Sequence, residues 1–130
     1  MTRIKAMEGE SVTFRARPTN EDGATVYLSG IETALVSVFD TSSATKSTPV
    51  FEEELVPSDI AFETLQVDLG WRSDKHGYTV KYALPAGILN EGGRVYRIEL
   101  VLRTFTSGPR PVVFLVETDS LWTARTALGV

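Results

Sequence analysis

Residues 92 to 104, GGRVYRIELVLRT, decide the fold class of this chain. After the two glycines, apolar and polar side chains alternate, and successive side chains of a β-strand point to opposite faces of its sheet. One face would carry Tyr96, Ile98, Leu100 and Leu102, and the other Arg97, Glu99 and Arg103 together with Val95 and Val101. The segment therefore predicts a strand that turns one face to a core and the other to solvent.

The same alternation recurs along most of the chain. Further strand candidates are residues 11–17, 24–28, 31–40, 50–56, 61–71, 78–84 and 111–119. Turn-forming clusters separate them at intervals of roughly ten residues, which is typical of an antiparallel sandwich, whereas helical periodicity is nearly absent. The sequence therefore predicts an all-β fold, an antiparallel β-sandwich of about seven to nine strands.

Two of these candidates make specific predictions about shared faces. In residues 61–71 the apolar face would carry Leu65, Val67, Leu69 and Trp71. In residues 78–84 it would carry Tyr78, Val80, Tyr82 and Leu84. Alternation assigns side chains to faces, but it does not say which face is wet.

Length and composition are those of one globular domain. The chain has 130 residues, of which 42% are hydrophobic and 23% charged, and this is enough to bury one core. Residues 1–119 contain every strand candidate and are assigned to one domain. Residues 120–130, SLWTARTALGV, lack strand alternation and are predicted to form a C-terminal tail, which either packs back over an open end of the same domain or docks on a partner.

Charge and cysteine content exclude several classes of partner and cofactor. Thirteen Lys and Arg against seventeen Asp and Glu give a net charge of −4, so no basic field is available to hold nucleic acid. Without cysteine, disulfides, thiolate zinc sites and iron–sulfur clusters are excluded. No stretch approaches the roughly 18 apolar residues of a membrane-spanning helix. We expect no cofactor, no membrane contact and synthesis in a cytoplasm.

His76, the only histidine, lies close to Asp74 in the turn RSDKHG. A catalytic pair of these residues would need a nucleophile such as Ser73, and no G-x-S-x-G elbow is present. No second histidine or cysteine can join His76 in a transition-metal site. We therefore interpret His76 as an exposed turn residue and assign neither catalytic nor metal-binding residues.

Acidic residues suggest two other sites. The carboxylates that could approach one another across a sheet are Glu52, Glu53, Glu54, Glu63 and Asp68. Glycoside hydrolysis uses such pairs, but charges on a short strand also protect a sheet edge, which we prefer here. NEDG at 20–23 lacks the spacing of a calcium loop and indicates a turn. NEGG at 90–93 precedes a strand, whereas phosphate loops precede a helix.

The run YTVKYALPAGILNEGGRVYRIELVL at 78–102 resembles the E strand, E-to-F connection and F strand of immunoglobulin-like and fibronectin type III-like domains. Leu84, Pro85, Tyr96 and Ile98 carry the resemblance. It implies an Ig-like sandwich in which Leu84, Tyr96 and Ile98 form a structural corner, the Tyr96 hydroxyl bonding back to the connection near 88–91. The chain departs from antibody domains, because it has no cysteine pair and Trp71 comes late.

A single cysteine-free module of this kind is also similar to Ig-like domains of bacteriophage tail, neck and capsid proteins. That likeness implies a non-enzymatic virion structural protein, made in the host cytoplasm, which binds protein subunits of a larger assembly. A homo-oligomer is expected, through an edge strand or through the tail, whose apolar residues are Leu121, Trp122 and Leu128. If the protein is not viral, we expect it to be cytoplasmic.

Two alternatives belong to other functional classes. A carbohydrate- or cell-surface-binding module would use exposed aromatic rings as stacking platforms, and Tyr27, Tyr82 and Trp71 are the candidates. A small hydrolase would need an activated nucleophile that strands alone do not supply. We therefore expect a structural or interaction module before either of these.

Overall fold

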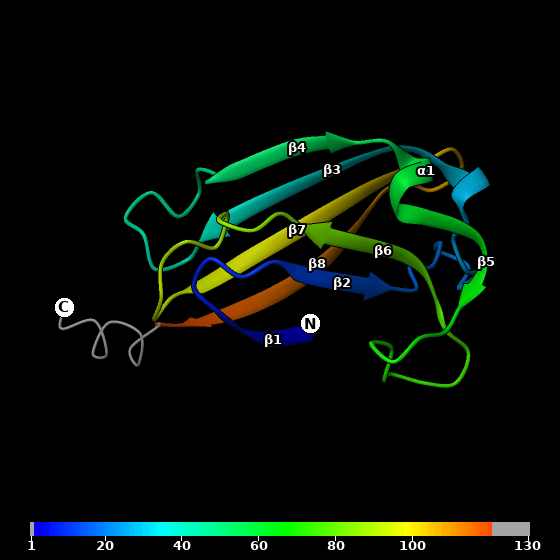
Figure 1. Cartoon of the computed structure of the whole chain (residues 1–130). Coiled ribbons are helices and arrows are strands. Elements are labelled where there is room, and N and C mark those ends of the chain that lie inside the picture. The colour runs from blue at the N-terminus through cyan, green and yellow to red at the C-terminus, as the bar shows by residue number, and fades with distance from the viewer. Residues whose placement is uncertain (1, 121–130) are drawn as a thin grey trace, which may run out of the picture.

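A computed structural model describes residues 2–120, which form eight strands and two short helical turns (Figure 1). The strands are β1 (Thr2–Met7), β2 (Val12–Ala16), β3 (Ile31–Asp40), β4 (Phe51–Leu55), β5 (Ala61–Gln66), β6 (Tyr78–Leu84), β7 (Val95–Thr104) and β8 (Gly108–Asp119). A 3-10 turn η1 (Leu28–Gly30) precedes β3, and one turn of helix α1 (Pro57–Ile60) precedes β5. No helix in this described part is long and apolar enough to cross a membrane.

The strands form two sheets that lie one in front of the other (Figure 1). The larger has the order β1-β8-β7-β3-β4 and the smaller β2-β6-β5. The predicted all-β class is thus confirmed, and most neighbours are antiparallel. The exception is β1, which pairs with β8 in parallel. β1 was not predicted from the sequence, and alternation within a segment does not specify its neighbour in any case. The strand predicted at 24–28 is wrong, because this segment makes only an isolated bridge between Thr19 and Thr25 and then enters η1.

The hydrophobic core lies between the sheets, and β7 supplies its centre. Tyr96, Ile98, Leu100 and Leu102 are each at most 2% exposed, as the alternation predicts. From the facing sheet, Phe14 stacks on Phe114 with ring centroids 4.8 Å apart. Burying a side chain of this size stabilises the fold by about 1.5–3 kcal/mol, so a few such positions decide whether this domain folds.

The prediction for residues 61–71 is wrong in its second half, because β5 ends at Gln66. Leu65, Val67 and Leu69 are exposed, Leu69 to 94%. The chain leaves the sheet here since Asp68 binds Arg15 and the Tyr78 hydroxyl instead of continuing a ladder. Polar bonds to residues distant in sequence therefore override the local alternation.

The shared face predicted for residues 78–84 holds from Val80 onward but fails at Tyr78. The pairing of β5 with β6 is irregular between Ala61 and Gln66. Thr79 is fully buried and donates a hydrogen bond to the Val26 carbonyl at 2.7 Å. Tyr78 is buried too, but it packs outside the core cluster, against Phe62 and Trp71.

Candidate interaction surfaces

The connection between β5 and β6, residues 67–77, is fastened to β2 by an arginine–aspartate pair. The Arg17 guanidinium donates to both carboxylate oxygens of Asp74, at 3.0 and 2.5 Å, and to the Gly77 carbonyl at 2.9 Å. Asp74 also accepts from the backbone of His76 and from the Trp71 ring nitrogen. Bidentate pairs of this kind fix geometry as well as charge.

Gly77 lets this connection pass close to β5. Its φ is +106°, and a Cβ at this position would lie 2.3 Å from the Gln66 carbonyl oxygen. Only glycine tolerates such a conformation in such a space. The approach places the Gly77 carbonyl where Arg17 can reach it.

A second cluster holds the start of the same connection. Asp68 accepts hydrogen bonds from the Tyr78 hydroxyl at 2.6 Å, from Arg15 and from Lys81. Arg15 and Lys81 are register partners on β2 and β6. The guanidinium of Arg15 also lies over the Tyr78 ring, 5.8 Å from its centroid. One carboxylate thus joins two strands and a buried tyrosine.

These contacts perturb the acidity of both aspartates. The Tyr78 hydroxyl, and after it Arg15, lower the pKa of Asp68 to about 2. The Arg17 guanidinium, followed by the backbone N–H groups of Gly77 and His76, holds the pKa of Asp74 well below its usual range. Hydrogen bonds to the ionised form stabilise that form. Both carboxylates are therefore charged and occupied by protein partners at neutral pH.

The residues considered for catalysis in the sequence analysis occupy separate places in the structure. The His76 side chain is exposed in its turn, as predicted, and its contact with Asp74 is through the backbone N–H. The acidic residues considered in the sequence analysis are divided between the two sheets. Asp68 contacts β2 and β6 of the smaller sheet, whereas Glu52, Glu53 and Glu54 lie on β4 of the larger sheet. Among residues 2–120 no three acidic or histidine side chains gather in a group that could hold a metal ion.

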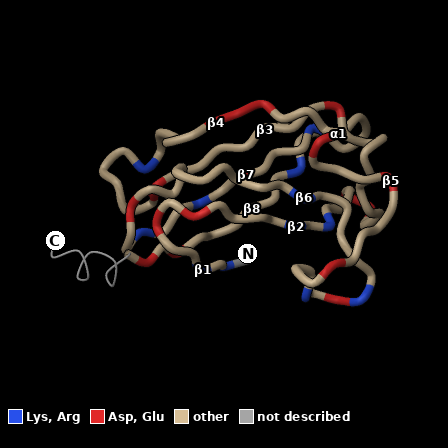
Figure 2. The backbone as a smooth tube through the Cα atoms, viewed as in Figure 1, with Lys and Arg blue, Asp and Glu red and all other residues tan. Residues whose placement is uncertain are grey.

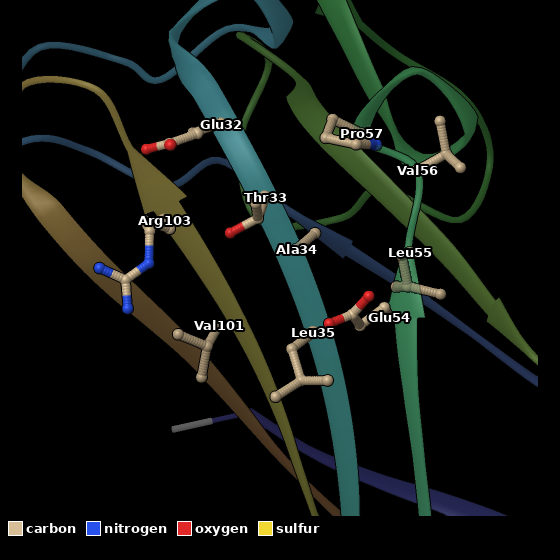
Figure 3. Close-up of a pocket in the computed structure, with 10 residues that line it drawn as sticks. All are labelled: Glu32, Thr33, Ala34, Leu35, Glu54, Leu55, Val56, Pro57, Val101 and Arg103. Carbon is tan, nitrogen blue, oxygen red and sulfur yellow. The ribbon is translucent and has the colours of Figure 1, made fainter.

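A groove of about 420 Å³ lies on the solvent face of the larger sheet, near the end of β4 (Figure 3). Leu35 of β3 and Val101 of β7 form an apolar floor, since they are neighbours in register. Its remaining lining residues are Glu32, Thr33, Ala34, Glu54, Leu55, Val56, Pro57 and Arg103. Carboxylates and a guanidinium over aliphatic side chains can bind a polypeptide, but the set offers no activated nucleophile.

The two borders of the larger sheet carry opposite charge (Figure 2). β4 contributes three consecutive glutamates, Glu52 to Glu54, all exposed. β1, at the other border, contributes Arg3 and Lys5, which are exposed too. β4 lies at the border of the sheet, as expected from its acidic residues. An edge strand presents unpaired backbone groups to any further strand.

The aromatic platforms proposed for sugar binding are mostly occupied. Tyr82 is 7% exposed and belongs to the core, so its selection as a stacking ring is wrong. Burial raises the pKa of Tyr82 to about 12, with Glu53 adding to the effect. Trp71 is half-buried, with the Arg17 guanidinium 5.9 Å from its ring centroid and Tyr78 beside it. Tyr27 is half-buried as well.

The three residues that the resemblance assigns to a structural corner lie at the end of β6 and at the start of β7. Leu84, Tyr96 and Ile98 are each at most 1% exposed, and the Tyr96 hydroxyl accepts a hydrogen bond from the Glu91 N–H at 3.3 Å. The proposed docking residues Leu121, Trp122 and Leu128 lie outside the described residues. Arg15, Arg17 and Asp68 were not anticipated as a cluster, because strand alternation shows only that both arginines leave the core.

Comparison with known proteins adds no relative. No protein-family model matches the chain, no curated protein is similar to it, and no solved structure matches it.

Proposed function

We propose that this protein is an Ig-like β-sandwich and a non-enzymatic structural or interaction module of a larger assembly, with a bacteriophage virion as its setting. The strand orders of the two sheets and the Tyr96 corner support the Ig-like assignment. The virion setting is proposed because a single cysteine-free module of this kind is similar to Ig-like domains of bacteriophage tail, neck and capsid proteins. Protein subunits, including further copies of this chain, are the proposed partners.

The observation that carries the proposal is the pair of open borders on the larger sheet. β1 and β4 each have a strand on one side only, and strands added to such edges are a common way for proteins to associate. Arg15 of β2 and Arg17 just after it, by contrast, form ion pairs with the 67–77 connection. Surface complementarity is therefore the proposed mechanism, and catalysis has no part in it.

Light scattering after size exclusion of the full chain, over a wide concentration range, tests this proposal. We expect a defined oligomer that dissociates on dilution. A Trp122→Ala variant of the full chain then separates the two proposed routes: weakened assembly with unchanged circular dichroism assigns the contact to the tail, and unchanged assembly assigns it to an edge strand. A monomer at every concentration contradicts assembly through copies of this chain.

A further inference from the structure

We propose that the β1 border of one molecule pairs with the β4 border of a second copy, extending the larger sheet with Lys5 opposite Glu52 and Arg3 opposite Glu54. The inference rests on the proposed function, because it names the surface through which the module assembles. Strand direction, backbone phase, side-chain face and charge each support it.

Strand direction permits the pairing. β1 runs parallel to β8, and β8–β7, β7–β3 and β3–β4 are each antiparallel. Three reversals leave β4 antiparallel to β1. A second copy placed beside β4 in the same orientation therefore presents its β1 antiparallel to β4, which is the slightly more stable arrangement.

The backbone of β4 turns its glutamates to the open border. The Thr41 N–H donates to the Val95 carbonyl at 3.0 Å, and the Val50 N–H to the Val38 carbonyl at 2.7 Å. Along a strand, the backbone N–H and C=O groups of successive residues point alternately to the neighbouring strand on one side and on the other. The backbone groups of Val36 and Val38 in β3 therefore point to β4. Those of Glu53, the register partner of Val36, point back to β3. The backbone groups of its neighbours Glu52 and Glu54 consequently face outward.

The backbone groups of Arg3 and Lys5 on β1 likewise point to the open border. The Glu8 N–H donates to the Asp119 carbonyl at 2.9 Å, whereas the Met7 N–H donates to the Glu10 carboxylate at 2.8 Å on the opposite side. By the same alternation, the backbone groups of Lys5 and Arg3 point away from β8, as those of Met7 do. Glu10 closes the Met7 end of this border and leaves Arg3 and Lys5 open to a further strand.

The charged side chains also share one face of the sheet. Glu52 and Glu54 are register partners of Ser37 and Leu35. Lys5 and Arg3 are register partners of Glu117 and Leu115, and Arg3 forms an ion pair with Glu117. Both sets lie on the solvent face, since the residues between them in β3 and β8 are core residues.

Only one register joins both pairs. Pairing Glu52 with Lys5 places Glu54 opposite Arg3. After a slip of two residues, only one glutamate still lies opposite a basic residue, and the other glutamate and the other basic residue have no charged partner. A slip of one residue turns the side chains to opposite faces. Acidic edges also discourage contact between like edges, so the same glutamates disfavour β4–β4 association and favour the basic border. Such a head-to-tail contact builds rings or filaments.

Charge reversal tests the pairing in the full-length protein. We expect Glu52→Lys/Glu54→Lys and Arg3→Glu/Lys5→Glu each to raise the dissociation constant of self-association about 100-fold or more, because each sets like charges opposite one another. An equimolar mixture of the two variants restores association to within about tenfold of the unaltered protein, since every border then meets its opposite. Two single variants of β4 give a matched control: Glu54→Lys should weaken association, whereas Glu53→Lys, whose side chain lies on the opposite face of the sheet, should leave it unchanged.

Other outcomes separate this inference from the proposed function. Assembly that survives both reversals but fails in Trp122→Ala overturns the edge pairing and leaves the module assembling through its tail. Loss in both variants without recovery in the mixture also overturns it, because the borders then contact something other than each other. A monomeric unaltered protein contradicts both proposals. If circular dichroism shows that a double variant does not fold, the single changes Glu52→Lys and Lys5→Glu give the same test.

Discussion

Two connections of similar length join β6 to its neighbours in the chain, and different chemistry holds each. Residues 67–77 are held by two partly exposed ion pairs, Arg15 to Asp68 and Arg17 to Asp74. Residues 85–94 are held by burial of Leu89 in the core and by the hydrogen bond from the Glu91 N–H to the Tyr96 hydroxyl. Arg94 adds ion pairs to Asp40 and Glu91 only at the end of this second connection.

The difference shows how one small fold uses apolar burial and charge for separate tasks. Burial of Leu89 does not depend on pH and resists salt, because it removes apolar surface from water. The aspartate pairs stabilise their connection only while the carboxylates are ionised. We therefore expect residues 67–77 to respond to acid and residues 85–94 to respond to changes in core volume.

The largest expected effect comes from the apolar anchor. Leu89→Ala should lower the free energy of unfolding by about 2–5 kcal/mol, because a fully buried leucine leaves a cavity. Leu69→Ala, in the other connection and 94% exposed, should change it by no more than about 0.5 kcal/mol. Urea unfolding followed by circular dichroism measures both. Equal effects would show that both connections depend on apolar burial.

Loss of the ionic anchor should cost less. Arg17→Ala removes three hydrogen bonds to Asp74 and Gly77, and we expect it to lower the free energy of unfolding by about 2 kcal/mol, the value for hydrogen bonds to charged groups. Arg72→Ala, an exposed arginine in the same connection, is the matched control. A comparable loss in both variants would assign the effect to net charge and not to this pair.

Acid should weaken the same connection without removing residues. Asp68 has its pKa lowered to about 2 and that of Asp74 is lowered too, whereas unfolded aspartate titrates near about 3.9. A depressed folded pKa gives stability that is complete above the unfolded value and lost as pH falls through the folded one. At about pH 3 we expect partial loss, smaller than in Arg17→Ala.

Trp71 gives a local measurement of that loss, because its ring nitrogen donates to Asp74. In a Trp122→Phe background it is the sole tryptophan, and its fluorescence should stay constant until the pH falls well below about 3.9, because the pKa of Asp74 is lowered. Far-ultraviolet circular dichroism should change less over the same titration. A fluorescence change centred at about pH 3.9, the pKa of an unperturbed aspartate, would contradict an ionic anchor.

The smallest effect is expected from the corner hydroxyl. Tyr96→Phe removes its hydrogen bond from the Glu91 N–H and should lower the free energy of unfolding by about 1 kcal/mol. Tyr82→Phe is the matched control, since its buried hydroxyl has no hydrogen-bond partner in the described structure. Removing an unsatisfied hydroxyl should be neutral or stabilising. Equal losses in thermal unfolding would mean that the Tyr96 bond contributes nothing.

Sequence reasoning succeeded where the deciding interactions are local. The buried face of β7 and the core residues of β3 follow from period-two alternation within a single strand, and the edge position of β4 follows from its consecutive glutamates. It failed at Tyr78 and at Val67 and Leu69, because the irregular pairing of β5 with β6 and the bonds of Asp68 involve partners far away in the chain. No pattern within one segment contains that information.

The sequence by itself determined the all-β class and the two faces of β7, because side-chain alternation is a property of a single segment. Only the tertiary structure decided that β1 runs beside β8, that Arg17 meets Asp74, and that Arg3 and Lys5 border the same sheet as Glu52 and Glu54. Those outcomes depend on which distant segments pack together, and packing is settled by the whole chain at once.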